Sequence, residues 1–303
     1  MWFFSKKKFN AVLGIDINTD FISIVKLIKN NDGRFKLINY GILNANKEIL
    51  QTDQTVLPER DVSFMIKELL YKMNESNELN KTNVIMSIPY NASFMFNLDM
   101  PNIPEQEFDK AIKFEARSML PIAPSKVELN WQIISKNDNG FKILVIAVPK
   151  EVIAQYKNIA KRLGFSIKIL EIRTFSLIRA LEIGAKNTLL VDFNNKNFNI
   201  SFIKNGLINM SNSDKFADKI FNVDKLLNGI NNFTEFLQEK IEKIVLLSTN
   251  LDVNSIKSQL SKKIKISIDT MDCCYKIDCN SQLKSVLEEK KYMLASAIGL
   301  AMY

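Results

Sequence analysis

The chain has no histidine and only three cysteines among its 303 residues. Without histidine it cannot hold a histidine-dependent nucleophilic triad, a histidine general base or a histidine-ligated metal. Cys273, Cys274 and Cys279 lack the paired spacing of a zinc site, and so few cysteines are typical of a reducing compartment. No apolar run reaches the roughly 18 residues of a membrane-spanning helix. We therefore expect a cytoplasmic protein that binds no metal through cysteine or histidine.

Glycine and arginine are also scarce. Nine glycines leave few positions where bare backbone can approach a phosphate group. Lysine and arginine outnumber aspartate and glutamate by 41 to 33, a formal net charge of +8, but only six of the 41 are arginine. A nucleic-acid interface favours arginine and clusters its basic residues, whereas lysine here is spread along the whole chain. We predict no nucleic-acid partner.

The order of predicted elements indicates an α/β protein with two related lobes. Three strands joined by short turns open the chain at 11–17, 21–29 and 35–42, and the same pattern returns at 188–193, 198–204 and 207–210. We expect residues 1–82 to begin lobe 1, residues 83–165 to form an inserted α+β module, and residues 166–303 to form lobe 2, with the final helix returning to lobe 1. Helices are predicted at 61–73, 104–120, 151–163, 174–183, about 214–230, 232–240 and 284–301.

The two halves share a motif at the end of their first strand. Asp16 and Asp192 each follow a buried strand and precede an apolar residue and an asparagine, Asn18 and Asn194. A carboxylate at such a turn can hold a hydrated magnesium ion while the turn amides point at phosphate. Alternatively, each aspartate only caps its own β-turn. The repetition of the motif favours the first interpretation.

Further short motifs follow each other in a fixed order along the chain. They are Leu13-Gly14-Ile15-Asp16, Ile85-Met86-Ser87-Ile88-Pro89, Leu98-Asp99-Met100-Pro101 with Glu105 to Phe108, Phe114-Glu115-Ala116 with Leu120-Pro121-Ile122, Ala147 to Glu151, Leu163-Gly164-Phe165 and Ala297-Ile298-Gly299-Leu300-Ala301. In these motifs the sequence resembles the type IV pilus assembly protein PilM family, a branch of the actin-like ATPase superfamily related to the division protein FtsA. The resemblance implies a two-lobed actin/Hsp70-like (ribonuclease H-like) fold with an inserted small α+β module.

The same resemblance implies ATP with Mg²⁺ as cofactor. Its nucleotide-binding positions correspond to Asp16, Asn18, Thr19, Asp192, Asn194 and Ser248, with Asp16 and Asp192 holding Mg²⁺ through water. The sequence departs from the family pattern at these turns: asparagine replaces glycine at Asn18 and Asn194, Ser23 stands at a lysine position, and Asn212-Ser213-Asp214 stands at a glycine pair. We therefore predict a degenerate nucleotide site and a scaffold rather than an enzyme.

The resemblance also implies a partner, the N-terminal cytoplasmic peptide of a PilN-like bitopic inner-membrane protein. It places the chain at the cytoplasmic face of the inner membrane, held there through this partner, beside other platform or motor proteins. An apolar groove suits such a peptide, and we predict its lining as Phe94, Phe96, Phe108, Ile112 and Glu115. The alternatives are that the apolar residues belong to the core and that Glu115, expected on the inner helix face, is neutralised by a lysine.

Two other functions remain open. The chain could be an active ATP-binding and ATP-hydrolysing actin-like protein whose asparagine turns still position phosphate. It could also be an FtsA-like division or filament protein, which is disfavoured because no counterpart of FtsA's C-terminal membrane-targeting helix is expected before Tyr303.

Overall fold

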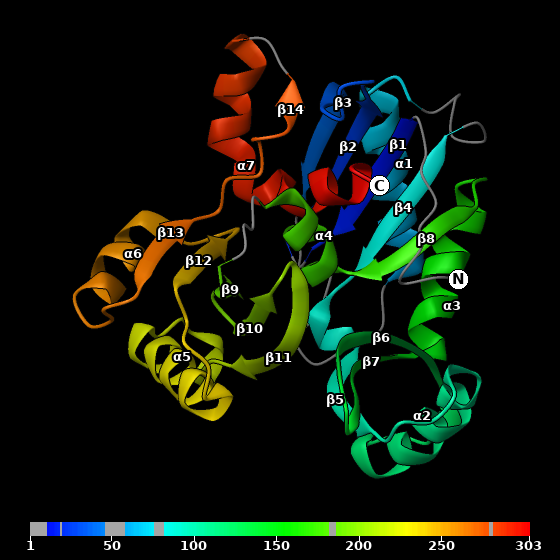
Figure 1. The fold of residues 1–303 in the computed structure, drawn as a ribbon. Helices are drawn as coiled ribbons and strands as arrows, with labels where there is room; N and C mark the ends of the chain where they lie inside the picture. Colours follow the sequence, from blue (N-terminus) through cyan, green and yellow to red (C-terminus); the bar gives the residue numbers. More distant parts are fainter. Residues whose placement is uncertain (1–10, 19, 46–57, 76–81, 182–185, 279–280) are drawn as a thin grey trace. The chain divides into compact units, whose positions relative to one another are not determined.

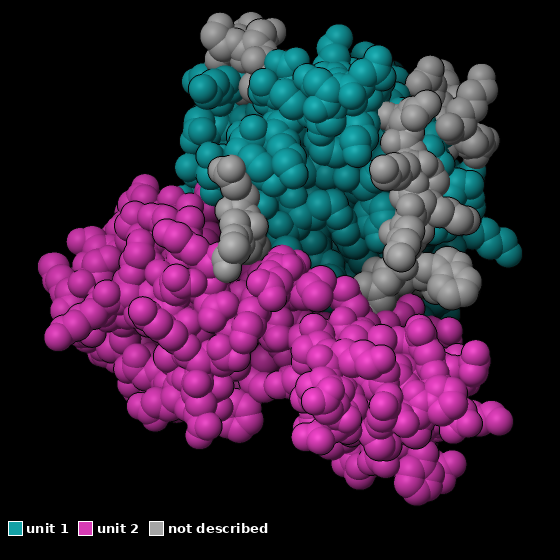
Figure 2. Space-filling view, viewed as in Figure 1, with its two compact units in different colours: residues 1–93, 148–182, 272–303 teal, residues 94–147, 183–271 magenta. Residues whose placement is uncertain are grey.

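The computed structural model describes residues 11–18, 20–45, 58–75, 82–181, 186–278 and 281–303 (Figure 1). The chain divides into two compact units, coloured separately in Figure 2. Unit 1 contains residues 1–93, 148–182 and 272–303, and unit 2 contains residues 94–147 and 183–271. Each unit is therefore assembled from segments that are distant in sequence.

Unit 1 is built on a six-stranded sheet with the order β14-β3-β2-β1-β4-β8. Its first three strands form an antiparallel meander, and β4 and β8 add to β1 in parallel. Because β1 and β4 are interior strands with both faces covered, their sequences are nearly continuous apolar runs. The strands are β1 (Ala11–Ile17), β2 (Phe21–Lys29), β3 (Phe35–Asn44), β4 (Asn83–Ile88), β8 (Ile167–Ile172) and β14 (Ile277–Asp278).

Helices cover this sheet, and α7 packs closely against it. It contacts β1, β2, β4 and α4. Glycine permits the close contacts of α7 with β1, at Gly14, and with α4, at Gly299. A Cβ atom on Gly14 would lie 2.3 Å from the carbonyl oxygen of Ala297, and one on Gly299 would lie 1.8 Å from the carbonyl oxygen of Ser176. The helical segments of unit 1 are α1 (Glu59–Lys72), η2 (Tyr90–Ala92), α3 (Lys150–Arg162), α4 (Arg173–Ala180) and α7 (Ser281–Ala301).

Unit 2 contains a five-stranded sheet with the order β11-β10-β9-β12-β13. An antiparallel meander again precedes parallel strands, so the start of this sheet repeats the pattern of unit 1. Helices α5 and α6 pack on it. The elements are β9 (Thr188–Phe193), β10 (Asn197–Lys204), β11 (Leu207–Lys215), η4 (Ala217–Lys219), α5 (Val223–Leu237), β12 (Lys243–Ser248), α6 (Val253–Ser261) and β13 (Ser267–Thr270).

Unit 2 also contains a three-stranded sheet, β5-β7-β6, with helix α2 packed against it. The hairpin between β6 and β7 turns at Gly140, whose φ of 141° suits glycine. A Cβ atom at this position would lie 2.0 Å from the carbonyl oxygen of Met100, so there is no room for a side chain. The elements are β5 (Phe94–Met100), α2 (Glu105–Met119), η3 (Pro124–Lys126), β6 (Val127–Asn137) and β7 (Gly140–Pro149).

The structure divides the chain differently from the predicted domains. Strand β4 and helix α3, which we assigned to the 83–165 module, belong to unit 1, because β4 lies between β1 and β8 in the large sheet. The remaining 94–147 segment groups with 183–271. The final helix α7 packs on the sheet of unit 1.

Three element predictions in the second half need correction. In place of the two helices predicted at about 214–230 and 232–240, the structure has one helix, α5 (Val223–Leu237). It begins at Asn222, whose side chain accepts from the backbone N–H of Lys225, and it ends at Gln238, which adopts a left-handed conformation. Strand β11 continues through residues 212–214, so these lie in a strand and not in a turn. Helix α6 was not predicted; Asp252 starts it by accepting from the N–H groups of Asn254 and Ser255.

Replacement of Gly299 by alanine tests the contact between α4 and α7. We expect Gly299→Ala to lower the free energy of unfolding by roughly 2 kcal/mol or more, because the new methyl group overlaps backbone that cannot rotate away. Gly33→Ala is the control, because nothing lies within 4 Å of a Cβ atom added there. Its positive φ alone should lower the free energy of unfolding, by about 1 kcal/mol. Urea unfolding measures both, and equal stability of the two variants would contradict the packing described here.

Candidate functional site

The end of strand β1 carries a buried carboxylate. Asp16 lies between β2 and β4 in the middle of the sheet and has 0% of its surface exposed. The strand is apolar on both sides of it, so the fold itself buries this side chain. Because an ionised carboxylate is very costly to bury without partners, the residues around Asp16 decide what it can do.

Both carboxylate oxygens of Asp16 are occupied. The hydroxyl of Ser87, in β4, donates to Oδ1, and the guanidinium of Arg173 donates to Oδ2 and forms an ion pair with it. Arg173 is the first residue of α4, directly after β8, and is itself buried. Parallel strands β4 and β8 end side by side, with Ser87 opposite Glu171, so their carboxyl ends deliver both partners to Asp16.

Two further hydroxyls lie in this buried region. Ser23 is paired with Asp16 across β1 and β2, and its Oγ has no hydrogen-bond partner among the described residues. The hydroxyl of Tyr156, in α3, is likewise buried without such a partner. Burial, and after it the negative charge of Asp16, raise the pKa of Tyr156 well above its usual value. Tyr156 therefore stays neutral at every physiological pH.

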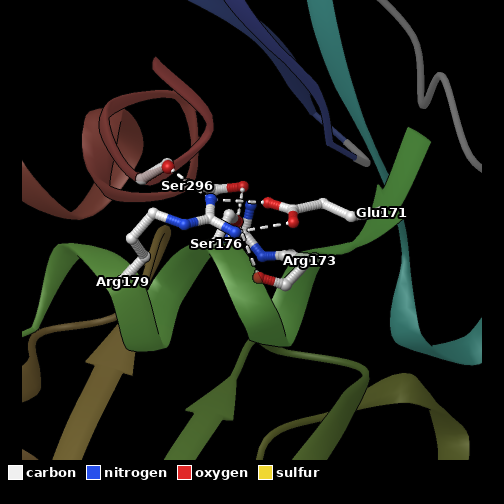
Figure 3. Close-up of polar contacts among 6 residues, drawn as sticks. Glu171, Arg173, Ser176, Arg179 and Ser296 are labelled. Carbon is white, nitrogen blue, oxygen red and sulfur yellow. Dashed lines mark hydrogen bonds and ion pairs between the residues drawn. The ribbon is translucent and has the colours of Figure 1, made fainter. Parts of the chain in front are cut away.

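A second arginine of α4 also neutralises a buried carboxylate (Figure 3). Arg179 donates to both oxygens of Glu171, at 2.9 and 2.7 Å, and to the carbonyl oxygen of Gly299 at 2.6 Å. Burial alone would lower the pKa of Arg179, but the charge and hydrogen bond of Glu171 outweigh it and raise the pKa. Ser176 and Ser296 add a 2.9 Å hydrogen bond between α4 and α7. Helix α4 is thus fixed to both β8 and α7.

Arg173 and Arg179 were missed in the sequence analysis. A signal was available: the chain has only six arginines, and two of them lie six residues apart directly after a buried strand. The planar guanidinium suits buried ion pairs better than the lysine ammonium does. In a chain that otherwise uses lysine, two arginines next to a strand end indicate buried carboxylates.

In unit 2 the predicted residues Asp192, Asn194 and Ser248 come together at the carboxyl ends of strands β9 and β12. Strands β9 and β12 are parallel, and Leu247 and Ser248 pair with Asp192 and Phe193. The Asn194 side chain accepts from the N–H groups of Lys196, at 2.7 Å, and Asn197, at 3.0 Å, so it closes its own turn. The Ser248 hydroxyl is buried without a hydrogen-bond partner among the described residues.

The other predicted nucleotide residues belong to unit 1. Asp16 ends β1, and the N–H of Asn18 donates to the carbonyl oxygen of Phe21 at 2.9 Å, which closes the turn into β2. Thr19 lies outside the described residues. The five described positions therefore form two sets, Asp16 and Asn18 in unit 1 and Asp192, Asn194 and Ser248 in unit 2.

The predicted peptide groove is only partly available. Phe108 and Ile112 are fully buried in the core of the small sheet with Leu98, Met100, Ile143 and Val145. Phe108 packs edge-on against Trp131 and Phe141, with centroid distances of 5.3 and 5.0 Å. These two residues therefore build the module and do not line an open groove.

Glu115 was expected on the inner face of α2, and this is wrong. The helix buries a narrow stripe of Phe108, Ile112 and Ala116, and Glu115 lies outside that stripe in an exposed position. Phe94 and Phe96 of β5 are half-buried and pack beside Ala116 and Leu120. Among the predicted groove residues, these two aromatic side chains and Glu115 retain accessible surface.

Phe96 also lines a cavity within unit 2, of about 490 Å³. Its walls come from β5, β7, β10, β11 and α5, and a Cβ on Gly229 would lie 2.7 Å from the Phe198 ring, so glycine lets α5 approach β10. The cavity is mainly apolar with a few amide groups. Its lining residues are Met95, Phe96, Asn97, Leu144, Phe198, Ile200, Met210, Ser211, Asn212, Asp214, Gly229, Asn232, Phe233 and Phe236.

The described part of the chain contains no cluster of three acidic or cysteine side chains that could hold a metal ion. Cys273 and Cys274 lie with their sulfurs 3.8 Å apart.

None of the described helices combines the length and apolar character needed to cross a membrane.

Two comparisons with known proteins each match most of this chain. A model of the family described as type IV pilus assembly protein PilM matches residues 14–213. A chain of a solved PilM–PilN type IV pilus biogenesis complex is similar over 96% of this chain and 97% of its own length, with a TM-score of 0.82 and 16% identity.

More distant structures share the architecture. A Bacteroides thetaiotaomicron protein with an actin-like ATPase fold and unknown function gives a TM-score of 0.53 at 12% identity, over 92% of this chain and 96% of its own. The cytoplasmic domain of EpsL, an inner membrane component of the Vibrio cholerae type II secretion system, gives 0.50 at 8% identity, over 93% and 95%. These likenesses confirm the predicted actin-like fold class.

Removal of the Tyr156 hydroxyl tests the buried region around Asp16. Tyr156→Phe should leave the free energy of unfolding unchanged or raise it by up to about 1 kcal/mol, because a buried hydroxyl without a partner contributes nothing favourable. Tyr156→Ala, which also removes the ring, should cost about 3–5 kcal/mol. A loss above about 1 kcal/mol in Tyr156→Phe would mean that this hydroxyl has a hydrogen-bond partner.

Proposed function

Because this chain belongs to the type IV pilus assembly protein PilM family, we propose that it works in type IV pilus assembly as a scaffold that binds a PilN-like membrane protein. The observation that carries the proposal is its similarity, over 96% of its length, to a chain of a PilM–PilN biogenesis complex. The match runs through both units, so the chain has the elements from which a binding surface of that kind would be made.

The partner contact is an N-terminal cytoplasmic peptide of the PilN-like protein. Such a peptide needs an apolar surface and backbone or side-chain hydrogen bonds, not catalytic groups. In the segment 94–147, Phe94 and Phe96 offer half-buried aromatic surface on β5, and Glu115 offers an exposed charge on α2. The fully buried Phe108 and Ile112 hold β5 and α2 together beneath them. The chain then lies at the cytoplasmic face of the inner membrane through this partner, where other platform or motor proteins can reach it.

A scaffold of this kind needs no ATP hydrolysis. The carboxylate expected to hold hydrated Mg²⁺ has both oxygens engaged by Ser87 and Arg173, and Asn194 uses its side chain to close its own turn. These contacts support a structural use of the aspartate and asparagine turns. They favour the scaffold over the ATPase alternative.

Titration of a fluorescently labelled peptide from the cytoplasmic N-terminus of the PilN-like protein tests this function. We expect saturable binding in the micromolar range, about 10⁻⁶–10⁻⁴ M, and no binding of a scrambled peptide. Phe96→Ala should weaken binding roughly tenfold, since aromatic anchors dominate such interfaces. Phe114→Ala is the matched control, because Phe114 is an exposed aromatic residue of the same module (66% exposed) outside the proposed groove.

Absence of saturable binding to the native peptide would overturn the scaffold function. Binding that is weakened by Phe114→Ala and not by Phe96→Ala would keep the function and move the peptide to the outer face of α2.

A further inference from the structure

The cofactor that the fold class implies is Mg²⁺ with ATP, and the surroundings of Asp16, one of the two carboxylates predicted to hold it, do not fit the metal. Magnesium binds one or two carboxylates and keeps several water molecules in an octahedral shell. Asp16 has no exposed surface, and its two oxygens already accept from Ser87 and Arg173. A hydrated cation could reach this carboxylate only by displacing a buried guanidinium.

Arg173 is built into the fold and is not a mobile surface group. Its side chain is 7% exposed, and it starts α4 directly at the carboxyl end of β8. The other end of α4 is held by Arg179, which binds Glu171 and the Gly299 carbonyl, and the Ser176–Ser296 hydrogen bond fastens the middle of the helix to α7 (Figure 3). Movement of Arg173 away from Asp16 would require these contacts to break as well.

The charges lead to the same result. A guanidinium in contact with the carboxylate cancels the negative charge that attracts a divalent cation, and it repels any cation brought to the same oxygen. Arginine remains protonated at every accessible pH, so this neutralisation is permanent. Loss of one member of a buried ion pair leaves the other charge uncompensated and strongly destabilises a protein.

We propose that Arg173 is the resident counter-cation of Asp16 and takes the place that the fold class would give to hydrated Mg²⁺. Unit 1 is then held in one conformation by an internal ion pair and does not respond to Mg²⁺ or to ATP. The proposal rests on the scaffold function proposed above and gives, in a single residue, a reason why that scaffold needs no ATP hydrolysis.

Thermal unfolding with and without millimolar Mg²⁺, Mn²⁺ or Mg²⁺ plus ATP tests this inference, together with Mn²⁺ binding measured by electron paramagnetic resonance. The wild-type chain should show no metal-dependent shift in Tm. Arg173→Gln, which keeps hydrogen-bond donors but removes the charge, should melt lower and recover several degrees, about 2–6 °C, when Mg²⁺ or Mn²⁺ is added, because Asp16 is now an unpaired carboxylate.

Arg179→Gln is the matched control. It breaks an equivalent arginine–carboxylate pair on the same helix, so it should lower Tm without creating a metal response at Asp16. A wild-type chain that is stabilised by Mg²⁺ or by Mg²⁺ plus ATP, with the effect abolished in Asp16→Asn, would overturn the proposal. A folded Arg173→Gln variant as indifferent to metal as the wild type would overturn it too.

A double variant keeps the proposal testable if Arg173→Gln does not fold. Asp16→Asn with Arg173→Gln removes both charges, so it should unfold at a higher denaturant concentration than either single variant. If the stability lost in the double variant equals the sum of the losses in the two single variants, Asp16 and Arg173 are not energetically coupled and the proposal is contradicted. Because peptide titration is measured separately, loss of the proposed function and loss of the counter-cation role can be told apart.

Discussion

Unit 1 depends on one buried ion pair, between Asp16 of β1 and Arg173 of α4. A carboxylate in the middle of a six-stranded sheet is tolerated only because Arg173 and Ser87 satisfy both of its oxygens. Since the three residues come from β1, β4 and the β8–α4 junction, the pair joins these elements at the carboxyl end of the sheet. The same contact that stabilises the fold also determines which ligands this edge can accept.

The actin-like architecture then serves as a frame for surfaces. In unit 1, α4 and α7 are tied to the sheet by a second arginine–carboxylate pair and by close backbone approaches at Gly14 and Gly299. In unit 2, a small sheet with an aromatic core holds Phe94 and Phe96 half-exposed on β5. Rigid frames of this kind can present a peptide-binding surface without any chemical step. That arrangement agrees with membership of a pilus assembly family.

Local patterns in the sequence were sufficient for most elements but not for the site. Strands β1, β2 and β9 have the predicted bounds, because buried apolar runs bordered by polar turns are a local signal. Arg173 could not be assigned to Asp16 in this way, because 157 residues separate them and only the sheet order brings them together. Helical spacing puts Phe108 on the inner face of its helix, but whether that face lines a groove or a core depends on the three-stranded sheet packed against α2.

The most direct test of nucleotide-independent scaffolding is the affinity for the PilN-like peptide, measured once in EDTA and once in saturating Mg²⁺ plus ATP. If Arg173 permanently replaces the metal, the two dissociation constants should agree within about a factor of two, because a ligand that does not bind cannot shift an equilibrium. A difference of about tenfold or more, a coupling near 1.4 kcal/mol, would show that nucleotide controls partner binding and would contradict this account.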